Sequence, residues 1–159
     1  MNAPDRLPPH DFKNHDLVDD TGKPGIKVEQ RPARTPGGEV VPGLFNTWIW
    51  LDNPGQFNSY TTDMVKGVIL AMRAASNARD VNCVVFTGVG DRAFCTGGDV
   101  QDIIGALFSH DYDGLLEFTR LTCDLILSIR QCRRPVVAAL NGTVAGAGAV
   151  IAAASDIRI

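Results

Sequence analysis

The sequence predicts an α/β fold with parallel strands, because strand-like and helix-like segments alternate along it and two of the strand-like segments run into glycine-rich loops. Its 159 residues, 45% hydrophobic and 21% charged, are enough for one core. We expect this domain over residues 45–159. Residues 1–44 are rich in Pro, Gly and charge, which is typical of a disordered extension or of an arm that orders against a partner subunit.

The first predicted strand begins near Phe45, where NTWIWLDNP alternates and is rich in aromatic residues, and it ends at the turn-forming pair Asn53-Pro54. An amphipathic helix is predicted within residues 59–80, since apolar residues recur there at spacings of one, three and four. The hydroxyl residues at its start are interpreted as helix caps and not as nucleophiles, namely Ser59, Thr61 and Thr62.

The second half continues the alternation. The β-branched run CVVFTG predicts a buried strand over residues 83–88, and a helical period over residues 115–132 ends before Pro135. Residues 136–140 predict a third strand, and the Ala-rich stretch after the Asn141-Gly142 turn predicts a short buried helix. The final DIRI resembles the start of another strand, so we expect the chain to be truncated.

Composition argues against several classes of function. The net charge of −3 gives no basic surface for nucleic acid, and no apolar run reaches the roughly 20 residues that cross a bilayer. The first residues lack the apolar core of a secretory signal, so a cytoplasmic protein is expected. The four cysteines show no CxxC spacing and are expected to be reduced thiols, with no metal site.

Two glycine-rich loops carry the candidate chemistry, FCTGGD over residues 94–99 and NGTVAGAG over residues 141–148. Loops of this composition expose backbone N–H groups, and a helix that follows adds the positive end of its dipole. Both loops could therefore bind one anionic group. Taken alone, Gly98 could serve only a tight turn and Ala147 only close helix packing. Asp99 is interpreted as a helix cap in preference to a ligand contact, and His110 as a loop or surface residue.

In this order, the segments WIWLDNPGQFNSYTTDM, VVFTGVGDRAFCTGGDV and RRPVVAALNGTVAGAG resemble the crotonase (enoyl-CoA hydratase/isomerase) superfamily, over residues 45–159. The resemblance implies a spiral of ββα repeats, of which this chain holds the N-terminal portion. It also implies that the N–H groups of Gly98 and Ala147 form an oxyanion hole for a thioester carbonyl. The residues implied in binding the substrate and its coenzyme A are Phe57, Asn58, Gly97, Gly98, Asp99, Val100, Gln101 and Ala147.

The same resemblance names no general acid or base. Val150 stands where hydratases of the superfamily have a Glu that positions and activates water, and Val can neither accept nor donate a proton. The second acid of the hydratases would fall beyond Ile159.

The implied function is that of an acyl-CoA hydratase or hydrolase acting through a thioester enolate. Residues 1–98 most resemble a branch of hydrolases that open a cyclic enone-CoA in anaerobic benzoyl-CoA degradation, whereas the rest resembles less specialised hydratases. An ordinary 2-enoyl-CoA hydratase or isomerase and a non-catalytic CoA-binding fragment remain alternatives. We expect no cofactor beyond the coenzyme A of the substrate, no nucleic-acid or membrane partner, and a homotrimer or homohexamer of the full-length protein.

Overall fold

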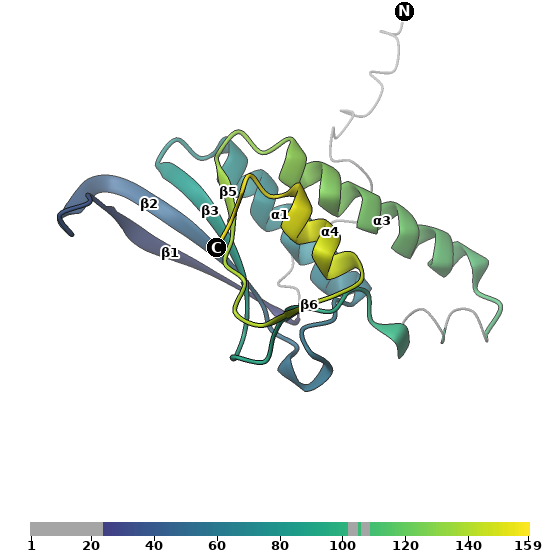
Figure 1. Ribbon diagram of the computed structural model, residues 1–159. Helices are drawn as coiled ribbons and strands as arrows, with labels where there is room; N and C mark the ends of the chain where they lie inside the picture. Colours follow the sequence, from purple (N-terminus) through teal and green to yellow (C-terminus); the bar gives the residue numbers. More distant parts are fainter. Residues whose placement is uncertain (1–23, 102–104, 106–108) are drawn as a thin grey trace, which may run out of the picture.

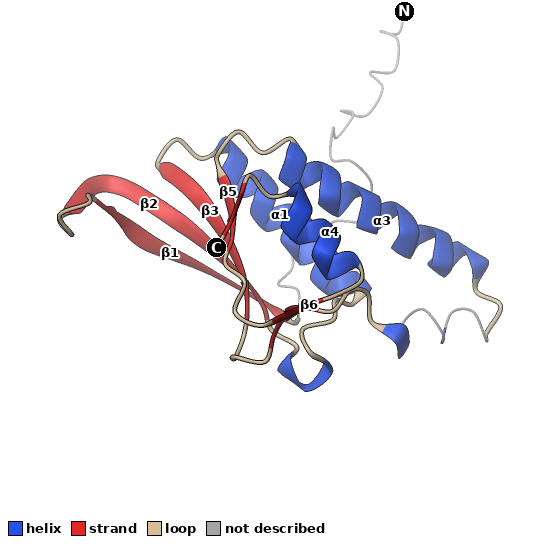
Figure 2. Cartoon of the chain, viewed as in Figure 1, coloured by secondary structure: helices blue, strands red, loops and turns tan. Residues whose placement is uncertain are grey.

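The computed structural model describes residues 24–101, 105 and 109–159, and it has two sheets with helices on one face of the larger sheet (Figures 1 and 2). The larger sheet has five strands in the order β1-β2-β3-β5-β7, and the smaller one pairs β4 with β6. The strands are β1 (Ile26–Arg34), β2 (Val40–Leu51), β3 (Val81–Gly88), β4 (Ala93–Cys95), β5 (Val136–Ala138), β6 (Thr143–Val144) and β7 (Ile157–Arg158). The helices are the 3-10 turn η1 (Pro54–Gln56) and the α-helices α1 (Thr62–Asn77), α3 (Tyr112–Arg130) and α4 (Ala147–Ala154).

The chain repeats one pattern, in which a strand of the large sheet is followed by a strand of the small sheet and then by a helix. The repeats are β3-β4-α3 and β5-β6-α4. In the large sheet β2, β3, β5 and β7 pair in parallel, so each return to this sheet adds a strand beside the previous one. The predicted α/β class and its spiral of ββα repeats are confirmed.

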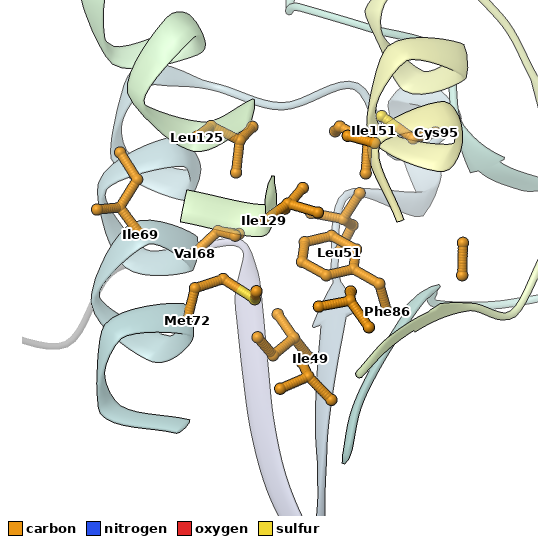
Figure 3. Close-up of a cluster of buried hydrophobic side chains, with 14 of the residues drawn as sticks. Ile49, Leu51, Val68, Ile69, Met72, Phe86, Cys95, Leu125, Ile129 and Ile151 are labelled. Carbon is orange, nitrogen blue, oxygen red and sulfur yellow. The ribbon is translucent and has the colours of Figure 1, made fainter. Parts of the chain in front are cut away.

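The core lies between the large sheet and the helices. Helix α1 begins at its cap Thr61, whose side chain accepts a hydrogen bond from the Met64 N–H at 3.3 Å, and α3 buries Leu121, Leu125 and Ile129 at helical spacing. Figure 3 shows Leu125 and Ile129 of α3 and Val68 and Met72 of α1 near the sheet residues Ile49, Leu51 and Phe86, with Ile151 of α4 beside Cys95. The large sheet, which carries β3 and β5, is therefore packed against both helices.

The predicted extension over residues 1–44 is wrong in its second part. Residues 26–34 form β1 and β2 begins at Val40, so the folded region starts near Ile26 and not at Phe45. The two strands pair antiparallel, with Ile26 opposite Leu51, and the Thr35–Glu39 turn joins them. Most side chains of β1 are exposed, so β1 is held in the sheet by its backbone hydrogen bonds to β2 and not by a row of buried side chains. Residues 1–23 of the predicted extension lie outside the described residues.

Candidate functional site

The small sheet brings the two glycine-rich loops together. Strands β4 and β6 pair in parallel with Ala93 opposite Thr143 and Cys95 opposite Val144, and each strand runs directly into its loop. The pairing extends into the second loop, because the Ala145 N–H donates to the Cys95 carbonyl at 3.1 Å. Residues 96–98 and 145–147 therefore leave the same edge of the sheet side by side.

The direction of the Gly98 N–H follows from its peptide plane. The Gly97 carbonyl accepts a hydrogen bond from the Tyr60 N–H at 2.9 Å, and the Asp99 N–H donates to the Tyr60 carbonyl at 2.8 Å. In a trans peptide the N–H points opposite to the carbonyl, so the Gly98 N–H points away from Tyr60. No described residue accepts a hydrogen bond from it.

The Ala147 N–H points out of the start of a helix. Ala147 is the first residue of α4, and the Gly146 carbonyl accepts from the Ala149 N–H at 3.0 Å. That carbonyl points along the helix, so the Ala147 N–H on the same peptide plane points out of its N-terminus. Among the described residues it too has no acceptor, and the dipole of α4 favours negative charge there.

Three glycines allow the loops to approach this closely. A Cβ on Gly97, whose φ is +109°, would lie 3.1 Å from the Ala147 nitrogen, and one on Gly146 would lie 3.0 Å from the Thr96 carbonyl oxygen. A Cβ on Gly148 would lie 2.1 Å from the Cys95 carbonyl oxygen. The Gly97–Gly98 segment and the start of α4 are therefore in direct contact through their backbones, and side chains here would separate the two N–H groups.

Asp99 joins the first loop to the rest of the molecule. One carboxylate oxygen accepts from the Gln101 N–H at 2.8 Å, at the start of the helix that begins at Val100, so its interpretation as a helix cap agrees with the structure. The other oxygen accepts from the Ser59 hydroxyl at 3.1 Å. The prediction that Ser59 caps the helix after it is wrong, because Thr61 fills that role; Asp99, 40 positions away, was not predictable as its partner.

Two asparagines hold the turn between β3 and β4. The buried Asn58 amide donates to the carbonyls of Ala93 at 2.7 Å and Val89 at 3.0 Å, and Asn141 donates to the carbonyl of Gly90 at 2.7 Å. Asn58 tolerates its φ of +55° because its short polar side chain suits the left-handed region. Its side-chain amide and its backbone N–H are both engaged, since the N–H donates to the Asn53 carbonyl at 2.8 Å, and its predicted contact with coenzyme A stays a prediction.

The remaining predicted binding residues lie at the rim of the site. Phe57 is 42% exposed, with the Arg92 guanidinium 4.4 Å from the centre of its ring. Both line a hollow of about 320 Å³, which Pro54, Gly55, Asn58 and residues 89–93 complete. Val100 is 61% exposed, and Gln101 is also exposed. The Phe57 carbonyl accepts a hydrogen bond from the Thr96 hydroxyl at 3.3 Å, which places Phe57 beside the first loop, and the role of these residues in binding stays a prediction.

Cys95 lies at the junction of the two loops. Burial raises the pKa of its thiol to about 11, and a hydrogen bond from the Gly97 N–H, at 3.5 Å from the sulfur, opposes this. It is a neutral thiol near neutral pH, and all four cysteines are free. In the part of the chain that the structure describes, no group of three His, Cys, Asp or Glu side chains is placed to hold a metal ion.

Two further predictions concern residues beside these loops. Val150 lies one turn after Ala147 and is 48% exposed, so an apolar side chain faces solvent near the Ala147 N–H. His110 is exposed, with a φ of +56°, as expected for a loop residue. None of the described helices is long and apolar enough to cross a membrane.

Comparison with known families and relatives gives the following matches. The family model described as enoyl-CoA hydratase/isomerase matches residues 46–159. A protein of Thauera aromatica named 6-oxocyclohex-1-ene-1-carbonyl-CoA hydrolase is 50% identical over 159 residues, which is 100% of this chain and 41% of that protein. A Geobacter metallireducens protein of the same name is 42% identical over 97% of this chain and 41% of its own length. The resemblance that the sequence assigns to residues 1–98 is thus a match to hydrolases of this name along nearly the whole chain, which spans about 41% of these curated relatives.

Solved structures show the same fold. An enoyl-CoA hydratase/isomerase from Mycobacterium paratuberculosis has a TM-score of 0.68 and 30% identity, over 88% of this chain and 50% of that one. An enoyl-CoA hydratase from Bacillus anthracis has a TM-score of 0.69 and 23% identity, over 84% of this chain and 46% of that one. The second likeness concerns the fold alone.

Proposed function

Since the chain belongs to the enoyl-CoA hydratase/isomerase family, we propose that it forms the acyl-CoA-binding part of an enzyme that stabilises a thioester enolate. The N–H groups of Gly98 and Ala147 are the proposed oxyanion hole. The observation that carries this proposal is that two N–H groups without an acceptor among the described residues lie at one edge of the small sheet, where a Cβ on Gly97 would be 3.1 Å from the Ala147 nitrogen.

The proposed chemistry depends on where negative charge develops. When a thioester becomes an enolate, charge moves onto its carbonyl oxygen, and donors already aimed at that oxygen stabilise the charged state more than the neutral one. Loss of one such donor typically raises the barrier by about 3–4 kcal/mol. The dipole of α4 adds to this stabilisation because its positive end is at Ala147.

The substrate we propose is 6-oxocyclohex-1-ene-1-carbonyl-CoA, an intermediate in the degradation of aromatic compounds. The support is the name shared by relatives that are 50% and 42% identical to nearly the whole chain. In the proposed sequence water adds across the ring C=C bond, as in a lyase running towards hydration, and a second water then hydrolyses the ring C–C bond. Both steps pass through enolate-like species that one oxyanion hole can stabilise.

Two alternatives have support of their own. An ordinary 2-enoyl-CoA hydratase or isomerase is favoured by the family description and by the names of the similar structures. A non-catalytic CoA-binding fragment is favoured by Val150, since an apolar side chain there cannot move a proton.

A turnover assay with the complete chain separates these proposals. The protein is incubated with 6-oxocyclohex-1-ene-1-carbonyl-CoA and, separately, with crotonyl-CoA, and products are resolved by chromatography. Ring opening of the cyclic thioester supports the hydrolase, hydration of crotonyl-CoA alone supports the ordinary hydratase, and tight binding of both without turnover supports the fragment. Binding of neither thioester would overturn the proposed function.

The remaining parts of the proposal concern cofactor, assembly and compartment. We propose that no cofactor acts beyond the coenzyme A of the substrate, so gel filtration to remove small molecules and dialysis against EDTA to remove metal ions should leave turnover or binding unchanged. For the full-length protein we propose a homotrimer or homohexamer, which light scattering would measure. A cytoplasmic location is proposed because acyl-CoA thioesters are made and used inside cells and because the cysteines are free thiols.

A further inference from the structure

The orientation of the Gly98 N–H depends on a buried polar contact that the proposed chemistry does not itself use. Segment 59–60 runs beside segment 98–99, joined by the two backbone hydrogen bonds of Tyr60. Next to this bridge, the hydroxyl of Ser59, which precedes Tyr60, donates to the carboxylate of Asp99, which follows Gly98, at 3.1 Å. Ser59 and Asp99 are each only 8% exposed, so this bond is largely shielded from water.

Tyr60, which follows Ser59 and pairs with Gly98, is firmly anchored. Tyr60 is 2% exposed, and its ring stacks on Phe118 of α3 with 6.1 Å between the ring centres. Segment 59–60 is thus a rigid support attached to the helical layer, and the first loop takes its position from that support.

We propose that Ser59 is a positioning residue, which through Asp99 holds the Gly97–Gly98 peptide plane so that the Gly98 N–H points at the thioester oxygen. This inference rests on the proposed function. The Asp99 carboxylate also caps the next helix through the Gln101 N–H, so it ties the loop at both ends. Without the Ser59 bond, the plane is held only by the Tyr60 backbone bonds and can tilt, which weakens a donor that must be aligned with its acceptor.

The test compares two ligands that differ at one carbon atom, which is a carbonyl in one and a methylene in the other. Butyryl-CoA has the thioester carbonyl, whereas S-butyl-CoA is a thioether without it. Calorimetric titration of the complete 159-residue chain gives the ratio of the two dissociation constants, which reports the hydrogen bonds to the carbonyl and not the contacts to coenzyme A. We expect Ser59→Ala to reduce the preference for the thioester about fivefold, with S-butyl-CoA affinity changed less than about twofold.

The matched control is Thr61→Ala, which removes a hydroxyl two residues away that caps α1 and does not touch Asp99. It should lower the melting temperature and leave the thioester preference unchanged. Ser59→Thr, which keeps the hydroxyl, should restore most of the preference. A second readout is the stretching frequency of the bound thioester carbonyl, which should shift less from its solution value in Ser59→Ala than in the unaltered protein.

The outcomes separate the two proposals. If the unaltered chain binds both ligands equally, the oxyanion hole itself is wrong. If it prefers the thioester and Ser59→Ala keeps that preference, the proposed function stands and the role of Ser59 is overturned. Should Ser59→Ala fail to fold, Ser59→Cys, whose thiol is a far weaker donor than the hydroxyl, decides by the same ratio; failure of both to fold would assign the pair to stability and overturn the inference.

Discussion

The two glycine-rich loops present their N–H groups by different means. In the first loop, side chains and backbone bonds from elsewhere hold the Gly98 peptide, through Tyr60, Ser59 and Asp99. In the second loop no side-chain cap holds the start of α4, and Ala147 is positioned by the helix itself, which lies against the small sheet at Gly148. Hydrogen bonds therefore hold the first loop, and a close steric contact between backbones holds the second.

This difference predicts different sensitivities to mutation. A polar network fails when one partner is removed, because the buried group left behind loses its hydrogen bond. A close backbone contact fails when a side chain is added, because main-chain atoms cannot move aside cheaply. The first loop should therefore respond to deletions of side-chain atoms, and the second to additions.

The largest effect is expected for Gly148→Ala. The added methyl group would lie 2.1 Å from the Cys95 carbonyl oxygen, so α4 must move away from β4. We expect a loss of more than about 3 kcal/mol in the free energy of unfolding, measured by urea denaturation. Gly55→Ala is the control, since no atom lies within 4 Å of its added methyl group, and a similar loss there would argue against the steric contrast.

The next effect is expected for Asn58→Ala, which deletes polar atoms beside the first loop. It leaves the Asn53 N–H and the Val89 carbonyl without their partners, at a cost of about 2–3 kcal/mol. Asn141→Ala should cost a similar amount. Both amides donate to the Ala93 carbonyl, at 2.7 Å and 3.3 Å, so each single variant leaves that carbonyl one donor and the double variant leaves it none. The double variant should therefore lose more than the sum of the single losses, and strict additivity would contradict a shared acceptor.

The helices and strands were largely predictable, because in most of them buried apolar residues recur at a regular spacing. The spacing of Met64, Val68 and Met72 identifies α1, and Leu121, Leu125 and Ile129 identify α3, since only one face of each helix is buried. Strand β1 lacks such a period because its side chains are exposed, and the TPGG turn over residues 35–38 was the one local sign of a hairpin.

The candidate site was only partly predictable. The paired loops and their glycines are visible in the sequence, because backbone exposure needs a recognisable residue type. The Ser59–Asp99 bond is not, since it joins two common polar residues that are distant in the chain, and nothing local selects the partner. The direction of an N–H is likewise a property of a peptide plane, which depends on what its carbonyl meets after folding.

A smaller effect is expected for Gly97→Ala, which tests the contact between the first loop and the start of α4. The new methyl group would lie 3.1 Å from the Ala147 nitrogen, and the φ of +109° adds strain for any residue with a side chain. We expect the preference for butyryl-CoA over S-butyl-CoA to fall about tenfold, since the methyl group covers the second donor. An unchanged preference would mean that the thioester oxygen does not lie between the two loops.

The smallest effect is expected for the thiol of Cys95. The carbonyl of this residue accepts the hydrogen bond from the Ala145 N–H that joins the two loops. Burial raises the pKa of the thiol from 9.0 to about 11 in the folded chain, so between these values the folded thiol stays protonated while the unfolded one ionises. Since the unfolded state then binds fewer protons, stability is full below about pH 9 and decreases as the pH rises towards 11. At pH 10 we expect the loss to be about 1 kcal/mol greater than in Cys95→Ala, measured by urea denaturation at pH 7 and pH 10. If the free energy of unfolding changed equally with pH in the two proteins, water would have to reach the Cys95 thiol between the two loops. The Gly98 and Ala147 N–H groups would then be in contact with water, and they would stabilise an oxyanion far less than the same groups in a dry site.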